Sequence, residues 1–583
     1  MAQDLPVLPV GWTDFEELRQ KNAVYVDKTM YFPKVIEKGK FVFCARPRRF
    51  GKSLTLSAFD AFCSGRADLF RGLAVEKDML SPDFIPRPVI RLNMLDVENS
   101  GNKEILAEKI LDCLGRNADR HNILLRGADY SNAFSCLIYD IRKESGKKVV
   151  LLIDEYDAPV INLSAKEKSA YDAKLLADTR DAIGSFYTAI KARADDIEFA
   201  FITGIIKFSG MGVFSKLNNL VDISLDSEFA AFMGYTKQEL KSNFSYFIGN
   251  TARKLRLSEK RLLKQIRDYY DGFSFDGKKK LYNPFSILSF FNLSKFRKYW
   301  MLSGSDGLIK KFLRDAALTV DQFEGMVVYD DFASNPGDIQ ITSPQGFLYQ
   351  AGYLTLRYRS GDSFCLEYPN LEVRQAISSL FLSNLILSWD KGGESGEKLG
   401  KLLAARDVPG MVELFWCLYS EICYDDHAEA DREPKPESFE RDVSDAFDFD
   451  LSVDELQRRA WDLAGKIKRK IGEGFYRSVL HAALWAAGAK VTPEKHEFLG
   501  RPDLEVVCGD LTYVIELKMA DDARSGSEAA WAGMSQIRKQ KYGRASGTPV
   551  RVSIAIGRNE RNIVACLFAI DGREMCVSPV MPE

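Results

Sequence analysis

The sequence predicts an α/β protein built from several domains. In residues 1–225, short apolar stretches alternate with helical patterns, as in a parallel sheet whose strands are joined by helices. A second alternation of helix and strand begins near residue 460. The chain has 583 residues, whereas a single hydrophobic core rarely grows beyond about 250–300 residues. We therefore expect two α/β domains at opposite ends of the chain.

The regions between these ends differ in composition. Residues 424–456 contain thirteen Asp or Glu against three Lys or Arg, which is typical either of a solvated linker or of an acidic flap that mimics nucleic acid. We expect a parallel-sheet domain over 1–225, a helical lid over 226–300, a winged-helix-like region over 301–390, a helical and acidic linker over 391–460, and a C-terminal α/β domain over 461–583.

The bulk composition excludes several classes of protein. Hydrophobic residues make up 46% and charged residues 28%, as in ordinary globular proteins, and the formal net charge of −2 excludes a strongly basic coat for nucleic acid. The ten cysteines form no CxxC pair, and only four histidines occur, so neither a disulfide framework nor a histidine-rich metal site is expected. No apolar run approaches 18 residues and no signal pattern opens the chain, which favours a cytoplasmic protein without a membrane partner.

A candidate phosphate-binding loop follows the strand expected over 40–45. The common motif is GxxxxGK[ST], whereas residues 46–53 read RPRRFGKS, so Arg46 replaces the first glycine. Backbone N–H groups at the start of the following helix, expected over 53–62, bind phosphate oxygens in such loops. We expect Lys52 to reach the β- and γ-phosphates and Ser53 to ligate Mg²⁺.

The partner of this loop is the apolar strand expected over 149–153, which ends in Asp154 and Glu155. We expect this strand to neighbour the loop strand in the sheet, so that its tip lies beside the loop. Asp154 would then join the Mg²⁺ shell and Glu155 would polarise the attacking water. A strand edge that meets solvent would look the same in isolation, but the two motifs together favour a nucleotide site. Thr203 ends another apolar strand, and is either a sensor of the γ-phosphate or part of a strand-terminal turn.

The roles of four further basic residues near these motifs are left open by the sequence. Arg48, Arg49, Lys207 and Lys216 could contact phosphates or a neighbouring subunit, or pair with surface acids.

The stretch over 46–54 resembles the signature of the bacterial AAA-ATPase-like proteins, whose phosphate loop begins with Arg-Pro-Arg-Arg. The resemblance runs from about residue 6 to 385 and implies an AAA+-related P-loop core with helical and wing-like parts, and ATP and Mg²⁺ as cofactors. It implies that the nucleotide is held by Arg49, Gly51, Lys52, Ser53, Leu54, Asp154 and Thr203. Other matching stretches are YVDKT (25–29), LIDEYD (152–157), ITG (202–204) with KFS (207–209), YDGF (270–273), YNPF (282–285), and YPN (368–370) with EVR (372–374).

A second candidate site lies near the C-terminus. Asp503 precedes a turn at Gly509 and Asp510, and Glu516-Leu517-Lys518 follows it. Side chains alternate along a strand, so Glu516 and Lys518 share a face, and pairing of the two strands would bring Asp503 near Glu516. The two carboxylates and the carbonyl of Leu517 would then hold Mg²⁺, with Lys518 positioning or deprotonating a water. The alternative is a hairpin whose polar residues face solvent.

This arrangement is similar to the PD-(D/E)XK nuclease fold. The resemblance implies that Glu473 is an upstream helical acid, Asp503 the first metal ligand, and Glu516 and Lys518 the E-x-K pair. Gln536 matches the glutamine of the following helix, and Tyr542 a downstream tyrosine. Clusters of Lys and Arg over 466–470 and 538–544 either grip phosphates or belong to solvated helix faces.

The leading hypothesis is therefore an enzyme with ATPase activity and a Mg²⁺-dependent nuclease activity that the ATPase controls. DNA is the favoured substrate, RNA stays open, and a homo-oligomer is expected. By analogy with similarly built proteins, the role would be defence against foreign DNA. The alternative is a nucleotide-dependent oligomerising switch, or a nucleic-acid-binding protein with an inactive nuclease-like domain.

Overall fold

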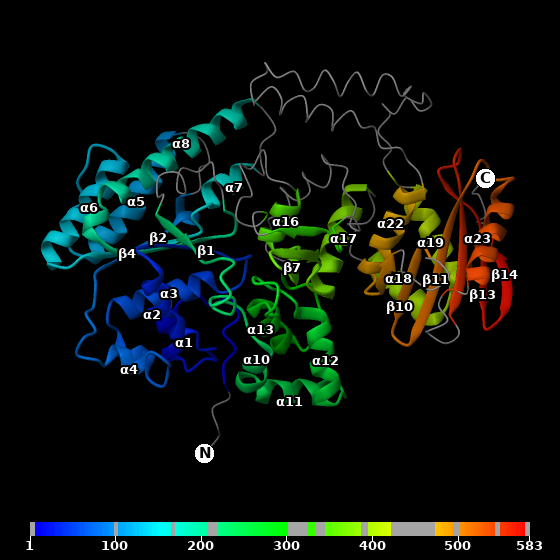
Figure 1. The fold of residues 1–583 in the computed structure, drawn as a ribbon, viewed down its shortest axis with the longest axis horizontal. Helices are drawn as coiled ribbons and strands as arrows, with labels where there is room; N and C mark the ends of the chain where they lie inside the picture. Colours follow the sequence, from blue (N-terminus) through cyan, green and yellow to red (C-terminus); the bar gives the residue numbers. More distant parts are fainter. Residues whose placement is uncertain are drawn as a thin grey trace. The chain divides into compact units, whose positions relative to one another are not determined.

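The computed structural model describes residues 6–97, 103–164, 170–207, 219–300, 323–329, 332, 344–385, 394–420, 422, 473–493, 502–540, 542 and 549–577. The described residues fold into two compact units (Figure 1), the first up to residue 373 and the second from residue 374 onward. The expected acidic segment over 424–456 lies outside the described residues. Among the helices of the described part, none is both long enough and apolar enough to cross a bilayer.

The first unit contains a five-stranded sheet in which every paired strand is parallel, as the alternating pattern predicts. Its order is β2-β3-β4-β1-β5. The expectation that the acidic strand neighbours the loop strand is wrong, because β4 lies between β1 and β3. The strands are β1 (Phe41–Ala45), β2 (Val89–Asn93), β3 (Val149–Asp154), β4 (Ile197–Gly204) and β5 (Leu220–Asp222).

Helices cover both faces of this sheet (Figure 1), so its central strands are apolar on both sides. Phe59 of α3 stacks on Phe199 and Phe201 of β4, at centroid distances of 5.7 Å each, which fixes the phosphate-loop helix against the sheet. The helices are α1 (Phe15–Gln20), α2 (Phe32–Lys38), α3 (Lys52–Cys63), α4 (Glu76–Met79), α5 (Lys103–Arg120), α6 (Tyr130–Ser145), α7 (Ala158–Ser164) and α8 (Ala170–Ala192).

A helical region follows the sheet, as expected, in α10 (Lys237–Asn243), α11 (Ser245–Lys254), α12 (Glu259–Tyr270) and α13 (Pro284–Leu293). Its start is a capping box, in which Thr236 and Glu239 satisfy each other's backbone N–H groups. An apolar core of its own holds it together, including Phe244, Ile266 and Phe291. Glu239 also pairs with the buried Lys28 at 2.6 Å, which ties the N-terminal segment to this region.

The described part of residues 301–390, for which a winged-helix-like region is expected, contains a helix and a small antiparallel sheet of order β6-β8-β7. Its elements are α16 (Pro344–Ala351), β6 (Val327–Tyr329), β7 (Thr355–Ser360) and β8 (Ser363–Glu367). Helix α17 (Leu371–Leu385) then crosses the division between the two units.

The second unit is built around a six-stranded sheet of order β14-β13-β12-β11-β10-β9, in which β11 and β12 are parallel and the other pairs antiparallel. Helices α18 (Glu394–Ala405) and α19 (Val408–Ser420) pack within this unit. The remaining elements are α22 (Glu473–Ala486), β9 (Lys490–Pro493), β10 (Leu504–Cys508), β11 (Leu511–Ala520), α23 (Gly526–Gln540), β12 (Val550–Gly557), β13 (Asn562–Ile570) and β14 (Arg573–Val577).

Candidate nucleotide site and candidate nuclease site

The phosphate loop ends at Gly51, which caps the N-terminus of α3 with a left-handed backbone (φ 88°) that favours glycine. No side chain caps this helix. The backbone N–H groups of its first turn, which includes Ser53 and Leu54, are therefore available to an anionic ligand. This is the feature that the motif predicts, and it survives without the first glycine.

Arg46 takes over a structural task at the position of the missing glycine. Its side chain is buried and donates hydrogen bonds to the carbonyl oxygens of Ala45, Ser224 and Phe229, and its guanidinium lies 4.0 Å from the ring centroid of Phe275. Arg46 thus ties the loop to the segment after β5. Sequence reasoning noted this residue as a departure from the common motif and as part of the family signature, but gave it no structural role.

Lys52 lies inside the loop. Its ammonium group donates to the carbonyl oxygens of Arg46 at 3.2 Å and Pro47 at 3.4 Å, and lies 3.3 Å from Glu155 Oε1. Its side chain is only 3% exposed, so the charge is held by these oxygens rather than by solvent. Lys52 and Glu155, about a hundred residues apart in the chain, therefore meet although β4 separates their strands.

Asp154 and Ser53 also meet, as two ligands of one metal ion must. The Ser53 hydroxyl lies close enough to the Asp154 carboxylate to stabilise its ionised form. Burial and the charge of Glu155 raise the pKa of Asp154, while Ser53, Lys52 and Arg91 act against this rise. Arg91, on β2, also donates to the carbonyl oxygen of Ser53 at 3.3 Å. Sequence reasoning missed Arg91, although a cation within an apolar strand is a usable signal.

A cavity of about 320 Å³ adjoins Glu155. Its walls include Arg48 and Arg49 of the loop, Leu95, and Ala158 of α7. Arg49 (φ 64°) and Glu155 (φ 48°) both have left-handed backbones, a strained conformation for residues other than glycine that concentrates at functional sites.

Arg49 is held in place by its neighbours. Its guanidinium lies 3.7 Å from the ring centroid of Phe285, which belongs to α13 of the helical region. Burial and the neighbouring Arg48 lower the pKa of Arg49, and the carboxyl of Glu372 opposes this effect. Arg49 therefore reaches the cavity from a fixed position.

Thr203 is not oriented as a sensor in this structure. It is fully buried, and its hydroxyl donates to the carbonyl oxygen of Cys44 at 2.8 Å, the residue opposite it on β1. A buried acid that the sequence reasoning did not single out, Asp157, instead receives the N–H groups of Ile205 and Ile206 just beyond β4, at 2.9 and 2.7 Å. Asp157 thereby couples the segment after β3 to the end of β4.

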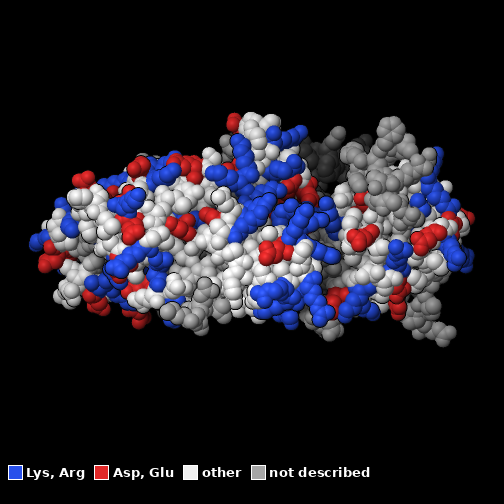
Figure 2. All heavy atoms as spheres, turned by 90° about the horizontal axis from the view of Figure 1, so that it is seen from below, with Lys and Arg blue, Asp and Glu red and all other residues white. Residues whose placement is uncertain are grey.

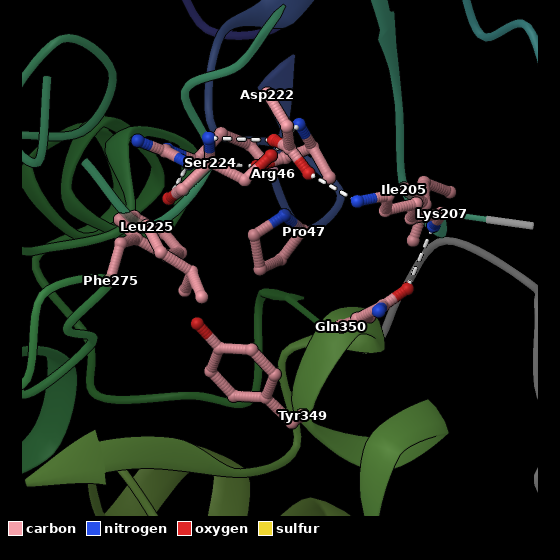
Figure 3. A pocket seen from close by; sticks show the side chains of 11 residues that line it. Arg46, Pro47, Ile205, Lys207, Asp222, Ser224, Leu225, Phe275, Tyr349 and Gln350 are labelled. Carbon is pink, nitrogen blue, oxygen red and sulfur yellow. Dashed lines mark hydrogen bonds and ion pairs between the residues drawn. The ribbon is translucent and has the colours of Figure 1, made fainter. Parts of the chain in front are cut away.

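Lys207 contacts helix α16 and the end of β5. Figure 3 shows it beside a small cavity of about 20 Å³, where its ammonium pairs with Asp222 at 3.0 Å and its backbone N–H donates to Gln350 of α16 at 2.8 Å. The hydroxyl of Tyr349 points into the same cavity, which Arg46 and Pro47 also line (Figure 3). Helix α16 thus bonds to the segment just after β4 and lines one cavity together with the phosphate loop. Lys216 lies outside the described residues.

The residues present fit a nucleoside triphosphate with Mg²⁺. An uncapped helix N-terminus and a lysine ammonium offer the phosphate contacts. The hydroxyl of Ser53 and the carboxylate of Asp154 are hard oxygen donors of the type that Mg²⁺ prefers.

The C-terminal acids lie together because the predicted hairpin forms. Leu504 pairs with Ile515, which places Asp503 opposite Glu516. Asp503 Oδ2 accepts the N–H of Leu517 at 2.8 Å, and the N–H of Asp503 donates to Glu516 Oε2 at 3.4 Å. The Glu516 carboxylate is buried inside the unit rather than turned to solvent, so the solvent-facing alternative is wrong.

Three charged side chains surround this acid pair. Lys518 Nζ donates to Glu516 Oε1 at 3.0 Å from the same face of β11. Arg477 Nη1, on α22, lies 3.7 Å from Asp503 Oδ1. Glu473 begins α22, and burial together with the charge of Asp503 raises its pKa. Arg477 was missed from sequence, although it stands one turn after Glu473 on the same helix.

The electrostatics show a surplus of negative charge in the cluster. Burial and the charge of Asp503 raise the pKa of Glu516 to about 7, against the opposing effect of Lys518. Burial acts to lower the pKa of Lys518, but its hydrogen bond to Glu516 and the surrounding acids raise it, so Lys518 is an ammonium at neutral pH. Acids whose pKa is raised by burial and by a neighbouring acid are concentrated at functional sites.

The same residues fit a Mg²⁺ ion, although no described group of three or more acidic, histidine or cysteine side chains already converges as a complete ligand set. The backbone N–H and C=O of one strand residue face the same side. Because the N–H of Leu517 meets Asp503, its carbonyl oxygen faces Asp503 as well. Asp503, Glu516 and Leu517 thus offer three oxygen donors on one side of β11.

Comparison with family models assigns both regions. Residues 9–214 match the family described as "Predicted AAA-ATPase", and residues 471–565 match the PD-(D/E)XK nuclease superfamily. The chain joins an AAA-ATPase-like domain to a PD-(D/E)XK nuclease domain. Both are enzyme domains, of an ATPase and of a nuclease, and the P-loop and PD-(D/E)XK folds predicted from sequence are confirmed.

A protein of Azotobacter chroococcum mcd 1, described as "Uncharacterized protein in vnfD 5'region", is 29% identical to the chain over 573 residues. The match covers 96% of this chain and 98% of that protein, so the similarity extends through both domains and the region between them. No solved structure matches the chain.

Helix α23 of the nuclease domain packs against β11, which carries Glu516 and Lys518, and against β12. A Cβ atom at Gly533 would lie 2.2 Å from Ser553 Oγ of β12 and 3.3 Å from Lys518 Cγ, so only glycine permits this approach. Gln536 lies three residues further along α23 and is partly buried. Tyr542 is buried in an apolar cluster with Val514 and Ile537, which is a packing position.

The two basic clusters expected to grip phosphates are described only in part. Lys466, Lys468, Arg469, Lys470, Lys541 and Arg544 lie outside the described residues. Arg538 of the nuclease domain is ion-paired with Glu574, and Lys539 is exposed.

Proposed function

We propose that the AAA-ATPase-like domain binds and hydrolyses ATP and thereby controls a Mg²⁺-dependent nuclease activity of the C-terminal domain, with DNA as the favoured substrate. The observation that carries the proposal is the acid cluster at the hairpin of β10 and β11. There the Glu516 carboxylate accepts hydrogen bonds from the N–H of Asp503 and the ammonium of Lys518, and the Asp503 carboxylate accepts the N–H of Leu517. These residues are brought together by the hairpin. Packing alone does not explain them, because apolar residues of similar volume would stabilise the unit as well or better.

In the nuclease site the roles follow from charge and position. When bound, Mg²⁺ would act as a Lewis acid toward the phosphate and lower the pKa of a water. Asp503, Glu516 and the Leu517 carbonyl would hold it, and Glu473 would support the cluster. The ammonium of Lys518 would hold the attacking water and offset charge on the phosphate. Gln536 would orient the substrate from α23. Water then adds to phosphorus, the P–O bond to the leaving sugar oxygen breaks, and that oxygen takes up a proton.

In the ATPase site, Lys52 and the N–H groups of the first turn of α3 would hold the phosphates, and Ser53 and Asp154 would hold Mg²⁺. Arg49 would approach the phosphates from the cavity side. Glu155 would orient the water that attacks the γ-phosphorus while the bond to ADP breaks. ATP must first separate Lys52 from Glu155, since these two side chains pair in the structure.

The matched test uses two acids of the same hairpin. Asp503→Ala should lower Mg²⁺-dependent cleavage of plasmid DNA by about 100-fold or more, because one ligand is lost. Asp510→Ala removes an exposed acid from the connecting turn and should leave cleavage unchanged. Full activity of the Asp503→Ala protein would refute the assignment, as would an absence of cleavage by the wild type on plasmid, single-stranded DNA and RNA alike.

The ion pair of Lys52 and Glu155 also favours a second candidate function, a switch that binds ATP and hydrolyses it slowly. The Glu155→Gln variant distinguishes the two candidate functions. For an ATPase, the variant should bind ATP and lose turnover by about 100-fold. For a slow switch, turnover is near background in the wild type already, and the substitution changes little.

We further propose that the protein acts as a cytoplasmic homo-oligomer in defence against foreign DNA. The support is the joining of an ATPase domain to a nuclease domain in one chain. Light scattering with and without ATP tests the assembly. Phage infection of cells that carry the wild-type or the Asp503→Ala protein tests the role.

A further inference from the structure

The helical region that follows the ATPase sheet carries a predominantly positive surface. Residues 237–268 contain nine cations and three acids, and all nine cationic side chains are exposed. By contrast, α5 and α6 with their connection, residues 103–145, contain seven cations and seven acids. The cations, named the lid basic surface from here on, are Lys237, Lys241, Arg253, Lys254, Arg256, Lys260, Arg261, Lys264 and Arg267.

The acids of this region do not neutralise the surface. Glu239 is turned inward to Lys28, and Asp268 pairs with Arg267 at 3.0 Å. Glu259 is exposed at the start of α12. Figure 2 views the molecule from the side on which α10, α11 and α12 lie in Figure 1, and shows Lys and Arg side chains gathered over its middle with few acids among them.

The cations are arranged on the outside of a firmly packed core. Helix α12 turns Leu262, Ile266 and Tyr270 into the apolar core, which leaves Lys260, Lys264 and Arg267 along the opposite face. Lys260 and Lys264 are one turn apart, as are Lys237 and Lys241 on α10. Each such like-charged pair destabilises the isolated helix. Lys260 and Arg261 also stand in the first turn of α12, where the helix dipole disfavours cations.

The chemistry of the surface favours a nucleic acid over a membrane as its anionic partner. A helix that binds a membrane surface needs an apolar face toward the lipid, but the leucines of this region, including Leu255, Leu257 and Leu263, pack against the core instead. A polyanion with closely spaced, solvated charges needs only the cations. Duplex DNA has one negative charge per about 1.7 Å of its axis, so the ~10 Å from Lys260 to Arg267 faces several phosphates.

We propose that the lid basic surface binds the phosphate backbone of duplex DNA without reading its sequence. This inference rests on the proposed function only in taking nucleic acid as the substrate class, and adds a binding surface outside the nuclease domain. The ATPase region would then hold the substrate that the nuclease domain cuts. Because counterions are released on binding, the affinity should fall steeply with salt.

Fluorescence anisotropy of a labelled duplex with the full-length protein tests this in EDTA, where binding does not depend on cleavage. Lys260→Glu with Lys264→Glu should weaken binding by about tenfold or more and reduce the slope of log affinity against log salt by about two. Lys260→Arg with Lys264→Arg should retain both. The matched control is Lys143→Glu with Lys191→Glu, the same charge change at exposed positions of α6 and α8, and should leave both unchanged.

Circular dichroism confirms that each variant is folded. An unchanged affinity and salt slope in the Lys260 and Lys264 variant would overturn the proposal, as would an equal loss in the control pair. Binding of the wild type to phosphatidylserine vesicles without binding to the duplex would assign the surface to a membrane instead. Failure of the nuclease proposal is seen separately, as absent cleavage in Mg²⁺ while binding in EDTA persists.

Discussion

At the scale of single residues, the loop over 46–53 shows that a residue departing from a common motif can supply stabilising contacts. Arg46 stands where the common P-loop has glycine, and its guanidinium satisfies three carbonyl oxygens while lying over Phe275. The chain therefore uses a side chain to hold the loop where other P-loops use backbone freedom.

Arg46→Gly restores the common motif but should destabilise the protein. Buried carbonyls lose their donors, at roughly 1–3 kcal/mol each, so a fall in Tm of several degrees is expected in thermal unfolding. Affinity for ATP should fall as well, because the loop loses its tie to Ser224 and Phe229. A glycine variant as stable as the wild type would show that Arg46 is dispensable to the loop.

Glu372 gives a pH-dependent prediction in the ATPase unit. It is fully buried, accepts hydrogen bonds from Ser286 Oγ and the N–H of Trp300 at 2.8 Å each, and burial raises its pKa to about 8. In the unfolded chain the group loses its proton near its ordinary pKa of about 4.3. Between about pH 4 and pH 8 the folded state therefore binds more protons than the unfolded state, and stability falls as pH rises.

Glu372→Gln mimics the protonated acid and removes this dependence. Its Tm should exceed that of the wild type by an amount that grows from about pH 5 to about pH 8 and then stays level, with about 2–4 °C for each kcal/mol. Differential scanning calorimetry across this range measures the gap. A gap that is constant with pH, or that narrows as pH rises, would contradict a buried neutral Glu372.

At the scale of elements, the sequence predicted features that depend on neighbouring residues, but it did not predict the order of the strands in the sheet. The strand tips, the phosphate-loop helix and the Asp503–Glu516 hairpin follow from apolar periodicity and turn residues, and the structure confirms them. The position of β4 between β1 and β3 depends on how strands pair across the sheet, which no local pattern records. The same holds for Arg477 and Arg91, whose importance comes from neighbours far away in the chain.

Packing of α23 on the nuclease sheet depends on Gly533. Gly533→Ala would place a methyl group against Ser553 Oγ, so we expect a loss of about 1–3 kcal/mol in the free energy of unfolding and weaker cleavage as α23 moves from Lys518. Ser553 Oγ has no hydrogen-bond partner among the described residues. The double variant Gly533→Ala with Ser553→Ala should therefore recover most of the loss.

The control for this experiment is Gly474→Ala on α22, where an added methyl group meets open space. It should be neutral or stabilising by up to about 1 kcal/mol. Chemical denaturation of all four proteins gives the comparison. If Ser553→Ala rescues nothing, the contact of Gly533 with β12 is not what holds α23 in place.

At the scale of the whole molecule, two acid–lysine clusters lie in different units of one chain. Lys52 pairs with Glu155 in the first unit, and Lys518 with Glu516 in the second. Each cluster joins residues that the sequence motifs predicted, and each belongs to a domain that the family models assign. The central claim is that the state of the first site sets the activity of the second.

The rate of plasmid cleavage in Mg²⁺, with and without ATP, tests this claim most directly in the wild type, Lys52→Ala and Lys518→Ala. The account predicts that ATP changes the rate for the wild type, that Lys52→Ala cuts at one rate whether or not ATP is present, and that Lys518→Ala hydrolyses ATP without cutting. Cleavage that responds to ATP equally in the wild type and in Lys52→Ala would contradict it.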